Sequence, residues 1–153
     1  MDNYSFHCRR VLLTEVADIE RAVKGKIYPQ GTIYVQVSAA RRTGLDQWRI
    51  SEKEGEIENK FAVLIPKNDI NPYYLLIALE RSAQEFLHKY VGTNINIQMD
   101  AFKWYELDYH ADRQTQELIA DFSKKANQGI ESEKKTIGAL HEIKKYMLGK
   151  MMC

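Results

Sequence analysis

The sequence predicts an α+β protein, with a compact mixed α/β domain over residues 1–110 and a long C-terminal coiled-coil helix over residues 111–153. Residues 32–37 are rich in β-branched and aromatic side chains, residues 57–66 end in an apolar run, and residues 71–81 have the pattern of a helix. From residue 118 to residue 151, apolar side chains recur at steps of three, four or seven with no proline between them. This spacing is typical of one long amphipathic helix.

The predicted tail helix needs a partner surface. Gly129, Gly138 and Gly149 each weaken a helix by up to about 1 kcal/mol relative to alanine, so helix propensity alone does not hold it. An alternative is a pair of helices that folds back on its own domain, with a break near Gly129. The stripe residues expected to meet a second copy or another protein are Ile119, Phe122, Ala126, Ile130, Ile137, Leu140, Met147 and Met151.

Composition indicates a globular protein without a membrane partner. The 153 residues are 44% hydrophobic and 28% charged, which suffices to bury a core. No run approaches the roughly 20 apolar residues of a membrane span, and the N-terminus lacks the basic and apolar regions of a signal peptide, so we expect a cytoplasmic protein. The two cysteines, Cys8 and Cys153, lie far apart and predict free thiols rather than a disulfide framework or a cysteine-rich zinc site.

The charge is nearly balanced. The formal net charge is +1; residues 1–110 hold 14 basic and 15 acidic side chains, and residues 111–153 hold 8 and 6. Any contact with nucleic acid must therefore come from a local patch rather than from a basic domain.

Along the domain, the pattern predicts a short helix within residues 10–22, capped by Thr14 if the helix starts there, and then a glycine- and proline-containing loop over residues 24–31. Residues 91–99 alternate polar and apolar side chains, so that a row of amides would face one way. Residues 103–109 predict a final short strand before the tail.

Two segments have the composition of a DNA-contacting surface. Residues 38–49 combine three arginines with amide, hydroxyl and tryptophan side chains, which suit phosphates and base edges, and the amides of residues 94–98 are able to pair with adenine. Taken alone, each segment is equally compatible with a solvated turn or a polar strand edge. The candidate DNA-binding residues are Lys24 and Lys26 on phosphates, with Gln30, Arg41, Arg42, Gln47, Arg49, Asn94, Asn96 and Gln98.

No pattern predicts catalysis, a metal site or a cofactor. The four histidines are scattered, and the sequence contains neither a zinc-protease motif nor a phosphate-binding glycine loop. Residues 71–74, Asn-Pro-Tyr-Tyr, are close to the Asn-Pro-Pro-Tyr signature of amino-methyltransferases. The second proline is missing, no glycine-rich motif follows a strand, and a helix start explains the Asn-Pro pair.

The order of these pieces resembles one half of a type I restriction-modification specificity subunit. The similarity rests on residues 13–19 followed by Gly25 and Lys26, residues 60–66 followed by 71–75, residues 92–95, residues 116–119, and the 140–151 end. In that family a target-recognition domain reads half of a bipartite DNA site. A conserved helix acts as a ruler and as a docking surface for methyltransferase subunits, and the full-length subunit has two such halves.

Two functions follow from the resemblance. The first is a non-catalytic DNA-recognition subunit that forms an antiparallel homodimer, reads double-stranded DNA, and docks the methyltransferase subunit, with the restriction subunit as a further partner. The second is an assembly or decoy (anti-restriction) protein that binds the methyltransferase through its tail without reading DNA. The neutral charge favours the second, and a DNA selection would distinguish them.

Overall fold

The computed structural model describes residues 7–38, 48–92 and 96–151. Contacts divide the chain into two units, Met1–Glu117 and Leu118–Cys153, which are considered separately. The first unit contains all the strands of the described residues together with the shorter helices, and the second consists of most of one long helix. The predicted α+β class with a long C-terminal helix is confirmed.

The first unit is built on a four-stranded antiparallel sheet in the order β2-β7-β4-β5. Two small antiparallel pairs, β1-β8 and β3-β6, accompany it. The strands are β1 (Cys8–Leu12), β2 (Ala17–Arg21), β3 (Ile27–Tyr28), β4 (Ile33–Gln36), β5 (Arg49–Ile50), β6 (Gly55–Glu56), β7 (Phe61–Pro66) and β8 (Glu106–His110). The register places Ile33 opposite Leu64 and Ile19 opposite Leu64 on its other side, so β7 is the central, buried strand.

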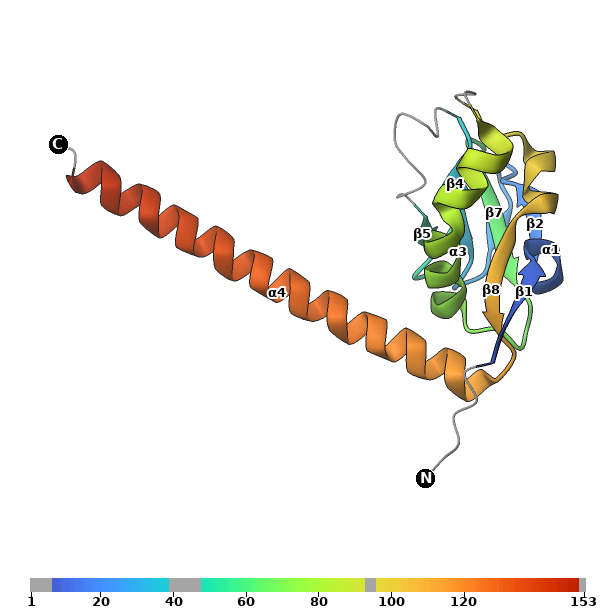
Figure 1. Cartoon of the computed structure of the whole chain (residues 1–153). Coiled ribbons are helices and arrows are strands. Elements are labelled where there is room, and N and C mark those ends of the chain that lie inside the picture. The colour runs from blue at the N-terminus through green and yellow to red at the C-terminus, as the bar shows by residue number, and fades with distance from the viewer. Residues whose placement is uncertain (1–6, 39–47, 93–95, 152–153) are drawn as a thin grey trace. The chain divides into compact units, whose positions relative to one another are not determined.

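Helix α3 (Pro72–Phe86) lies beside this sheet and against β8 (Figure 1). Its start is encoded locally: the Asn71 Oδ1 accepts hydrogen bonds from the backbone N–H groups of Tyr73 and Tyr74 at 3.0 and 3.1 Å, and Pro72 occupies the first turn. The interpretation of Asn71 and Pro72 as a helix start is therefore confirmed. A π-helical turn, η2 (Leu87–Val91), continues α3, and a 3-10 helix, η3 (Met99–Trp104), precedes β8.

Aromatic side chains close the core between α3, η3 and β8. Phe86 and Phe102 stack with ring centroids 5.6 Å apart, and Phe86 lies 4.4 Å from the Tyr105 ring. The buried Tyr105 hydroxyl donates to the Leu79 carbonyl at 2.7 Å, and burial raises the pKa of this hydroxyl. The Trp48 ring meets Tyr105 edge-on at 6.1 Å, which ties β5 to the same core.

The prediction of a short helix within residues 10–22 is wrong. Only one helical turn forms, α1 (Leu13–Val16), between strands β1 and β2, and its N-cap is Leu12 rather than Thr14. The Glu15 carboxylate accepts from the Leu12 N–H at 3.0 Å and so holds this single turn. The apolar residues on either side are used by two strands instead, with Val11 opposite Leu107 and Ile19 opposite Leu64.

Two further boundaries differ from the sequence prediction. The final strand begins at Glu106 rather than residue 103, because η3 occupies the residues before it. Residues 96–98 form no strand, but Asn96 and Gln98 are exposed on either side of the buried Ile97, so the expected alternation of polar and apolar faces holds there.

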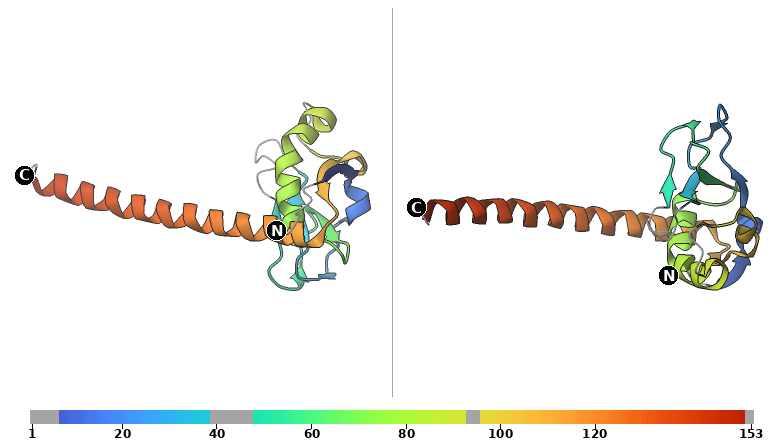
Figure 2. Two further views of the ribbon diagram at one scale, coloured as in Figure 1. Left: turned by 60° about the horizontal axis from the view of Figure 1, so that its bottom comes forward. Right: turned by 90° about the horizontal axis from the view of Figure 1, so that it is seen from above.

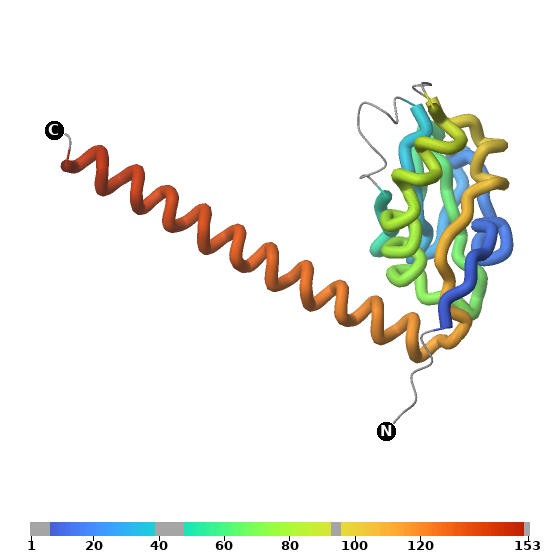
Figure 3. The backbone as a smooth tube through the Cα atoms, viewed as in Figure 1, coloured from blue at the N-terminus to red at the C-terminus, as the bar shows by residue number. Residues whose placement is uncertain are grey.

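Helix α4 (Arg113–Met151) is continuous through Gly129 and Gly138, as the further views and the tube drawing also show (Figures 2 and 3). The alternative of a break near Gly129 is therefore wrong. A Cβ added at Gly129, Gly138 or Gly149 would meet nothing within 4 Å. There is therefore room for a side chain at each of these three positions.

Candidate nucleic-acid interface

Several connecting segments meet at one end of the four-stranded sheet. The Ala22 N–H donates to the Phe61 carbonyl at 3.0 Å, the Val37 N–H to the Lys60 carbonyl at 3.4 Å, and the Ile97 N–H to the Val37 carbonyl at 2.9 Å. The exits of β2 and β4, the entry to β7 and the segment before η3 are thereby neighbours. We call this surface, made of residues 21–26, 36–38, 58–61 and 96–98, the loop end of the sheet.

The loop end carries four described cations, Arg21, Lys24, Lys26 and Lys60. The Arg21 Nε donates to the Asn59 carbonyl at 3.0 Å, which fixes the guanidinium beside the entry to β7. Lys26 lies with its Nζ 5.2 Å from the centroid of the Tyr28 ring, and the Lys60 Nζ lies 5.2 Å from that of Phe61. Both ammonium groups therefore lie within cation–π distance of an aromatic ring.

Carboxylates partly neutralise this surface. Lys26 forms an ion pair with Glu20, and the Lys60 Nζ lies 2.8 Å from the Glu58 Oε2. The hydrogen bond that the Lys26 ammonium donates to the Glu20 carboxylate raises the pKa of Lys26, because it favours the charged form of the lysine. Both pairs are solvent-exposed, and exposed pairs contribute only about 0–1 kcal/mol, so a phosphate is able to replace either carboxylate.

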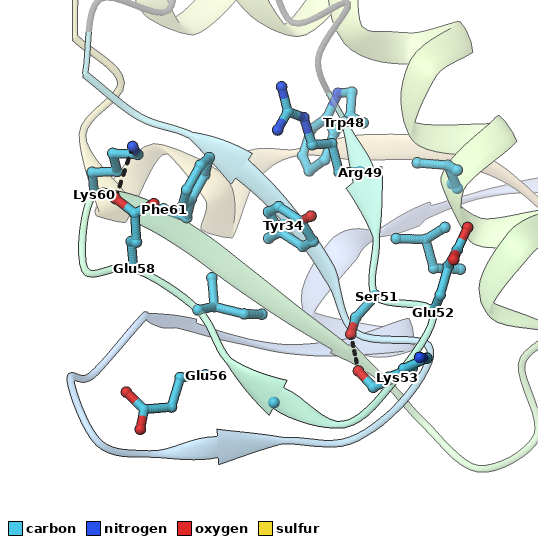
Figure 4. Close-up of a pocket in the computed structure, with 14 residues that line it drawn as sticks. Tyr34, Trp48, Arg49, Ser51, Glu52, Lys53, Glu56, Glu58, Lys60 and Phe61 are labelled. Atoms are coloured by element: carbon cyan, nitrogen blue, oxygen red, sulfur yellow. Dashed lines mark hydrogen bonds and ion pairs between the residues drawn. The ribbon is translucent and has the colours of Figure 1, made fainter.

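A cleft of about 810 Å³ lies beside the loop end (Figure 4). Tyr34 and Phe61 line it as an edge-to-face pair with ring centroids 5.2 Å apart, and Arg49 projects from β5 opposite Tyr34. The polar and charged side chains around it are Ser51, Glu52, Lys53, Glu56, Glu58 and Lys60. Half-buried aromatic rings beside an arginine suit the stacking and edge contacts that proteins make with bases.

The predicted DNA-binding residues that the structure describes lie at two different places on the domain. Lys24 and Lys26 lie at the loop end in the connection from β2 to β3, the exposed Asn96 and Gln98 lie there before η3, and Arg49 lies at the adjoining cleft. Gln30 is also exposed, but it belongs to the turn before β4. That turn is at the opposite end of the sheet, because the neighbouring Gly31 donates to the Ser51 carbonyl and approaches Pro72.

Arg41, Arg42, Gln47 and Asn94 lie outside the described residues. Sequence reasoning missed Arg21 and Lys60. Lys60 directly precedes the apolar strand β7, and a side chain at that position stays in solvent at the end of the sheet. This position in the sequence could have identified Lys60 as a candidate.

The eight residues predicted to form the partner face of the tail all lie on α4. Seven of these eight residues are exposed, with Phe122 at 74% and Met151 at 75%, and Ile119 is half-buried. Large exposed apolar side chains in this number on one helix mark an interaction surface.

Within residues 7–38, 48–92 and 96–151, no three His, Cys, Asp or Glu side chains gather in a way that would hold a metal ion. The same part of the chain contains no helix with the length and apolar character needed to cross a bilayer.

The sequence matches no protein-family model and no curated protein sequence. Solved structures, in contrast, match the fold. A chain from the structure describing complex assembly and conformational transition of the type I R-M system matches with a TM-score of 0.68 and 14% identity, over 84% of this chain and 40% of that one. The type I restriction-modification S subunit from M. genitalium matches with a TM-score of 0.66 and 16% identity, over 86% of this chain and 42% of its own.

The HsdS subunit from Thermoanaerobacter tengcongensis matches with a TM-score of 0.62 and 14% identity, over 85% of this chain and 40% of its own. At these identities the likeness concerns the fold. The resemblance predicted from the order of sequence segments is confirmed at that level: the chain has the fold found in type I specificity subunits and spans about two fifths of their length.

Proposed function

We propose that this chain is a non-catalytic DNA-recognition subunit of a type I restriction-modification system, acting in the cytoplasm. Its domain reads half of a bipartite site, and its tail pairs with a second copy and docks the methyltransferase subunit. One observation carries the proposal: 84–86% of this chain matches specificity-subunit structures, but the match covers only 40–42% of each of those longer chains. Two copies supply the two recognition domains of a full-length subunit.

An antiparallel pair explains how one domain type is sufficient. An antiparallel helix pair has a twofold axis, so the two domains are at opposite ends and face inverted copies of one half-site. The proposed target is therefore an interrupted palindrome. Each domain contacts it through the loop end, with Lys24, Lys26 and Lys60 on phosphates and Arg49, Asn96 and Gln98 toward bases.

The exposed apolar side chains of α4 are numerous enough for two partners. Leu118, Ile143 and Tyr146 are exposed by 43%, 58% and 64% and lie outside the eight predicted partner residues. These three share one flank of the stripe, because their spacing places them within a quarter turn of one another around the helix. We assign this flank to the methyltransferase subunit.

A selection from random duplexes tests the proposal. The purified chain with its methyltransferase partner should enrich an inverted repeat with a fixed gap. A selection that enriches no motif, while the complex with the methyltransferase still forms, would overturn DNA reading and support the decoy function. The observation that favours the decoy is the pairing of Lys26 and Lys60 with carboxylates, which leaves the loop end weakly basic.

Substitutions distinguish base reading from phosphate contact. Arg49→Ala should cost about 1–3 kcal/mol at one position of the half-site and relax the preference there. Lys24→Ala should weaken binding to all sequences alike and lower the slope of log affinity against log salt by about 2 for a dimer, since one cation is lost from each copy. If both variants bind DNA as the unchanged protein does at low salt, the assignment of the loop end is wrong.

A further inference from the structure

Two charged residues interrupt the apolar seam of α4. Steps of four and three residues connect Ile119, Ser123, Ala126, Ile130, Glu133, Ile137, Leu140, Lys144, Met147 and Met151, which is the alternation of a coiled-coil seam. All of these are apolar or small except Glu133 and Lys144. Each charge therefore lies where a partner helix would cover it.

Neither charge has a complementary neighbour on its own helix. On an α-helix, partners lie three or four residues away. Around Glu133 these positions hold Gly129, Ile130, Thr136 and Ile137, and around Lys144 they hold Leu140, His141, Met147 and Leu148. On the outer face, by contrast, the Lys134 Nζ lies 3.1 Å from the Glu131 Oε1. A carboxylate and an ammonium covered by apolar side chains without a partner are strongly unfavourable, so the covering surface must supply the opposite charge.

A second copy supplies both charges in one antiparallel register. If Ile137 faces Leu140 of the second copy, Glu133 faces Lys144 of the second copy, and by symmetry Lys144 faces its Glu133. The same register places Ile130 opposite Met147 and Ala126 opposite Met151, so apolar residues meet apolar residues throughout. The sequence of this face is thus complementary to its own reverse, as a twofold interface requires.

Other registers leave the charges unpaired. Sliding the helices by one heptad in one direction places Glu133 opposite Ile137 and Lys144 opposite Ala126. The opposite slide places them against Met151 and Leu140. A parallel pair brings Glu133 against Glu133 and Lys144 against Lys144. A charged residue at a seam position is a known means of setting register and orientation at some cost in stability.

We infer that Glu133 and Lys144 form two symmetric ion pairs across an antiparallel dimer of this chain and fix its register. The inference rests on the proposed function, to which it adds the partner surface and the spacing. In this register residues 126–151 of the two copies overlap. Their Glu117 positions are then about 65 Å apart along the rod at 1.5 Å per residue, which is roughly two turns of DNA.

Charge reversal in the full chain tests the pair, with the dimer dissociation constant measured by sedimentation equilibrium. Glu133→Lys alone and Lys144→Glu alone should each weaken self-association by about tenfold or more, because both symmetric contacts become repulsive. A mixture of the two variants should form a one-to-one heterodimer, and the double variant should recover self-association. Glu142→Lys and Lys135→Glu make the same charge changes on the outer face and should leave the dimer unchanged.

Disulfide trapping tests the register. With Cys8→Ser and Cys153→Ser in place, chains carrying Ile130→Cys and Met147→Cys should cross-link to each other when mixed. Neither should cross-link to itself, since its two copies lie 17 residues, or about 25 Å, apart along the rod. Self-linking of Ile130→Cys would overturn the antiparallel orientation.

Different outcomes would overturn the dimer register and the proposed function. A dimer that tolerates both charge reversals, while the DNA selection still enriches an inverted repeat, overturns the register and leaves the proposed function standing. A chain that stays monomeric at high concentration overturns the register and the homodimer together. Selection of an inverted repeat with the methyltransferase present remains the independent measure of DNA reading.

Discussion

Gln116 is expected to be the most sensitive residue at the start of α4. Its side chain is fully buried, its Oε1 accepts from the Asn71 N–H at 3.0 Å, and its Nε2 donates to the His110 carbonyl at 2.7 Å. One side chain thereby links the N-cap of α3, the end of β8 and the first turns of α4. Gln116→Leu keeps a similar volume but removes both hydrogen bonds.

The expected loss follows from those two bonds. Each contributes about 1 kcal/mol net, and leaving a backbone donor and acceptor unpaired in a half-buried site adds about 1 kcal/mol for each group. The total is about 2–4 kcal/mol, or a fall in Tm of about 8–16 °C for a domain of this size. Urea unfolding followed by tryptophan fluorescence measures it, because Trp48 and Trp104 both lie in the first unit.

Two variants make this measurement decisive. Gln114→Leu changes an exposed glutamine two residues earlier and should leave stability within about 0.5 kcal/mol of the starting protein. Gln116→Glu keeps an oxygen for the Asn71 N–H but sets another against the His110 carbonyl, so it should also destabilise the domain. If Gln116→Leu unfolds at the same urea concentration as Gln114→Leu, the two hydrogen bonds do not hold the domain together.

Three further predictions concern α3, pH and DNA. Asn71→Ala should cost about 1 kcal/mol, because the N–H groups of Tyr73 and Tyr74 lose their acceptor; Asn68→Ala, in the exposed turn before it, is the control in the same urea titration. Burial raises the pKa of Tyr74 to about 12, so the folded state holds this proton more tightly than the unfolded chain. Its contribution to stability should be intact below pH 10 and lost as pH rises from about 10 to about 12, and Tyr74→Phe should flatten that loss in urea titrations across the range. Glu58→Gln removes the ion pair of Lys60 and should tighten DNA binding at low salt by up to about fivefold per domain, whereas the control Glu54→Gln should not. Fluorescence anisotropy measures the affinities, and equal values for the two variants would count against Lys60 as a phosphate contact.

Much of the fold is visible in the sequence where its cause is local. Asn71 and Pro72 specify the start of α3 by capping chemistry, and the apolar run of β7 marks a central strand. The helix prediction for residues 10–22 was wrong because their apolar spacing fits a helix as well as two strands. The choice is made by β8 and β7, whose residues lie far away in the chain. Sequence patterns alone do not display such pairings.

The candidate site was predictable to a similar extent. Lys24, Lys26, Asn96 and Gln98 were identified from composition, and the fold brings their segments together at the loop end. The ion pair between Lys26 and Glu20 was not predicted, because six residues and a turn separate the two. Gln30 lies in the same sequence loop as Lys26 but at the opposite end of the sheet, since the strand β3 carries the chain from one to the other.

The weak charge of the loop end makes DNA binding depend on dimerisation through the self-complementary seam of α4. Because Lys26 and Lys60, two of the three loop-end lysines, are paired with carboxylates, each domain gains less from phosphates, and one copy is expected to bind DNA weakly. Joining two such domains through a rigid rod makes the second contact intramolecular, which raises the overall affinity by factors of about 10²–10⁴ if the spacing fits the site. Under the proposed function, DNA affinity then depends on the register of the tail. Glu133→Lys and Lys144→Glu should each reduce binding to the selected duplex far more than Lys24→Ala does, although neither residue lies near the loop end in the sequence, and mixing the two variants should restore binding.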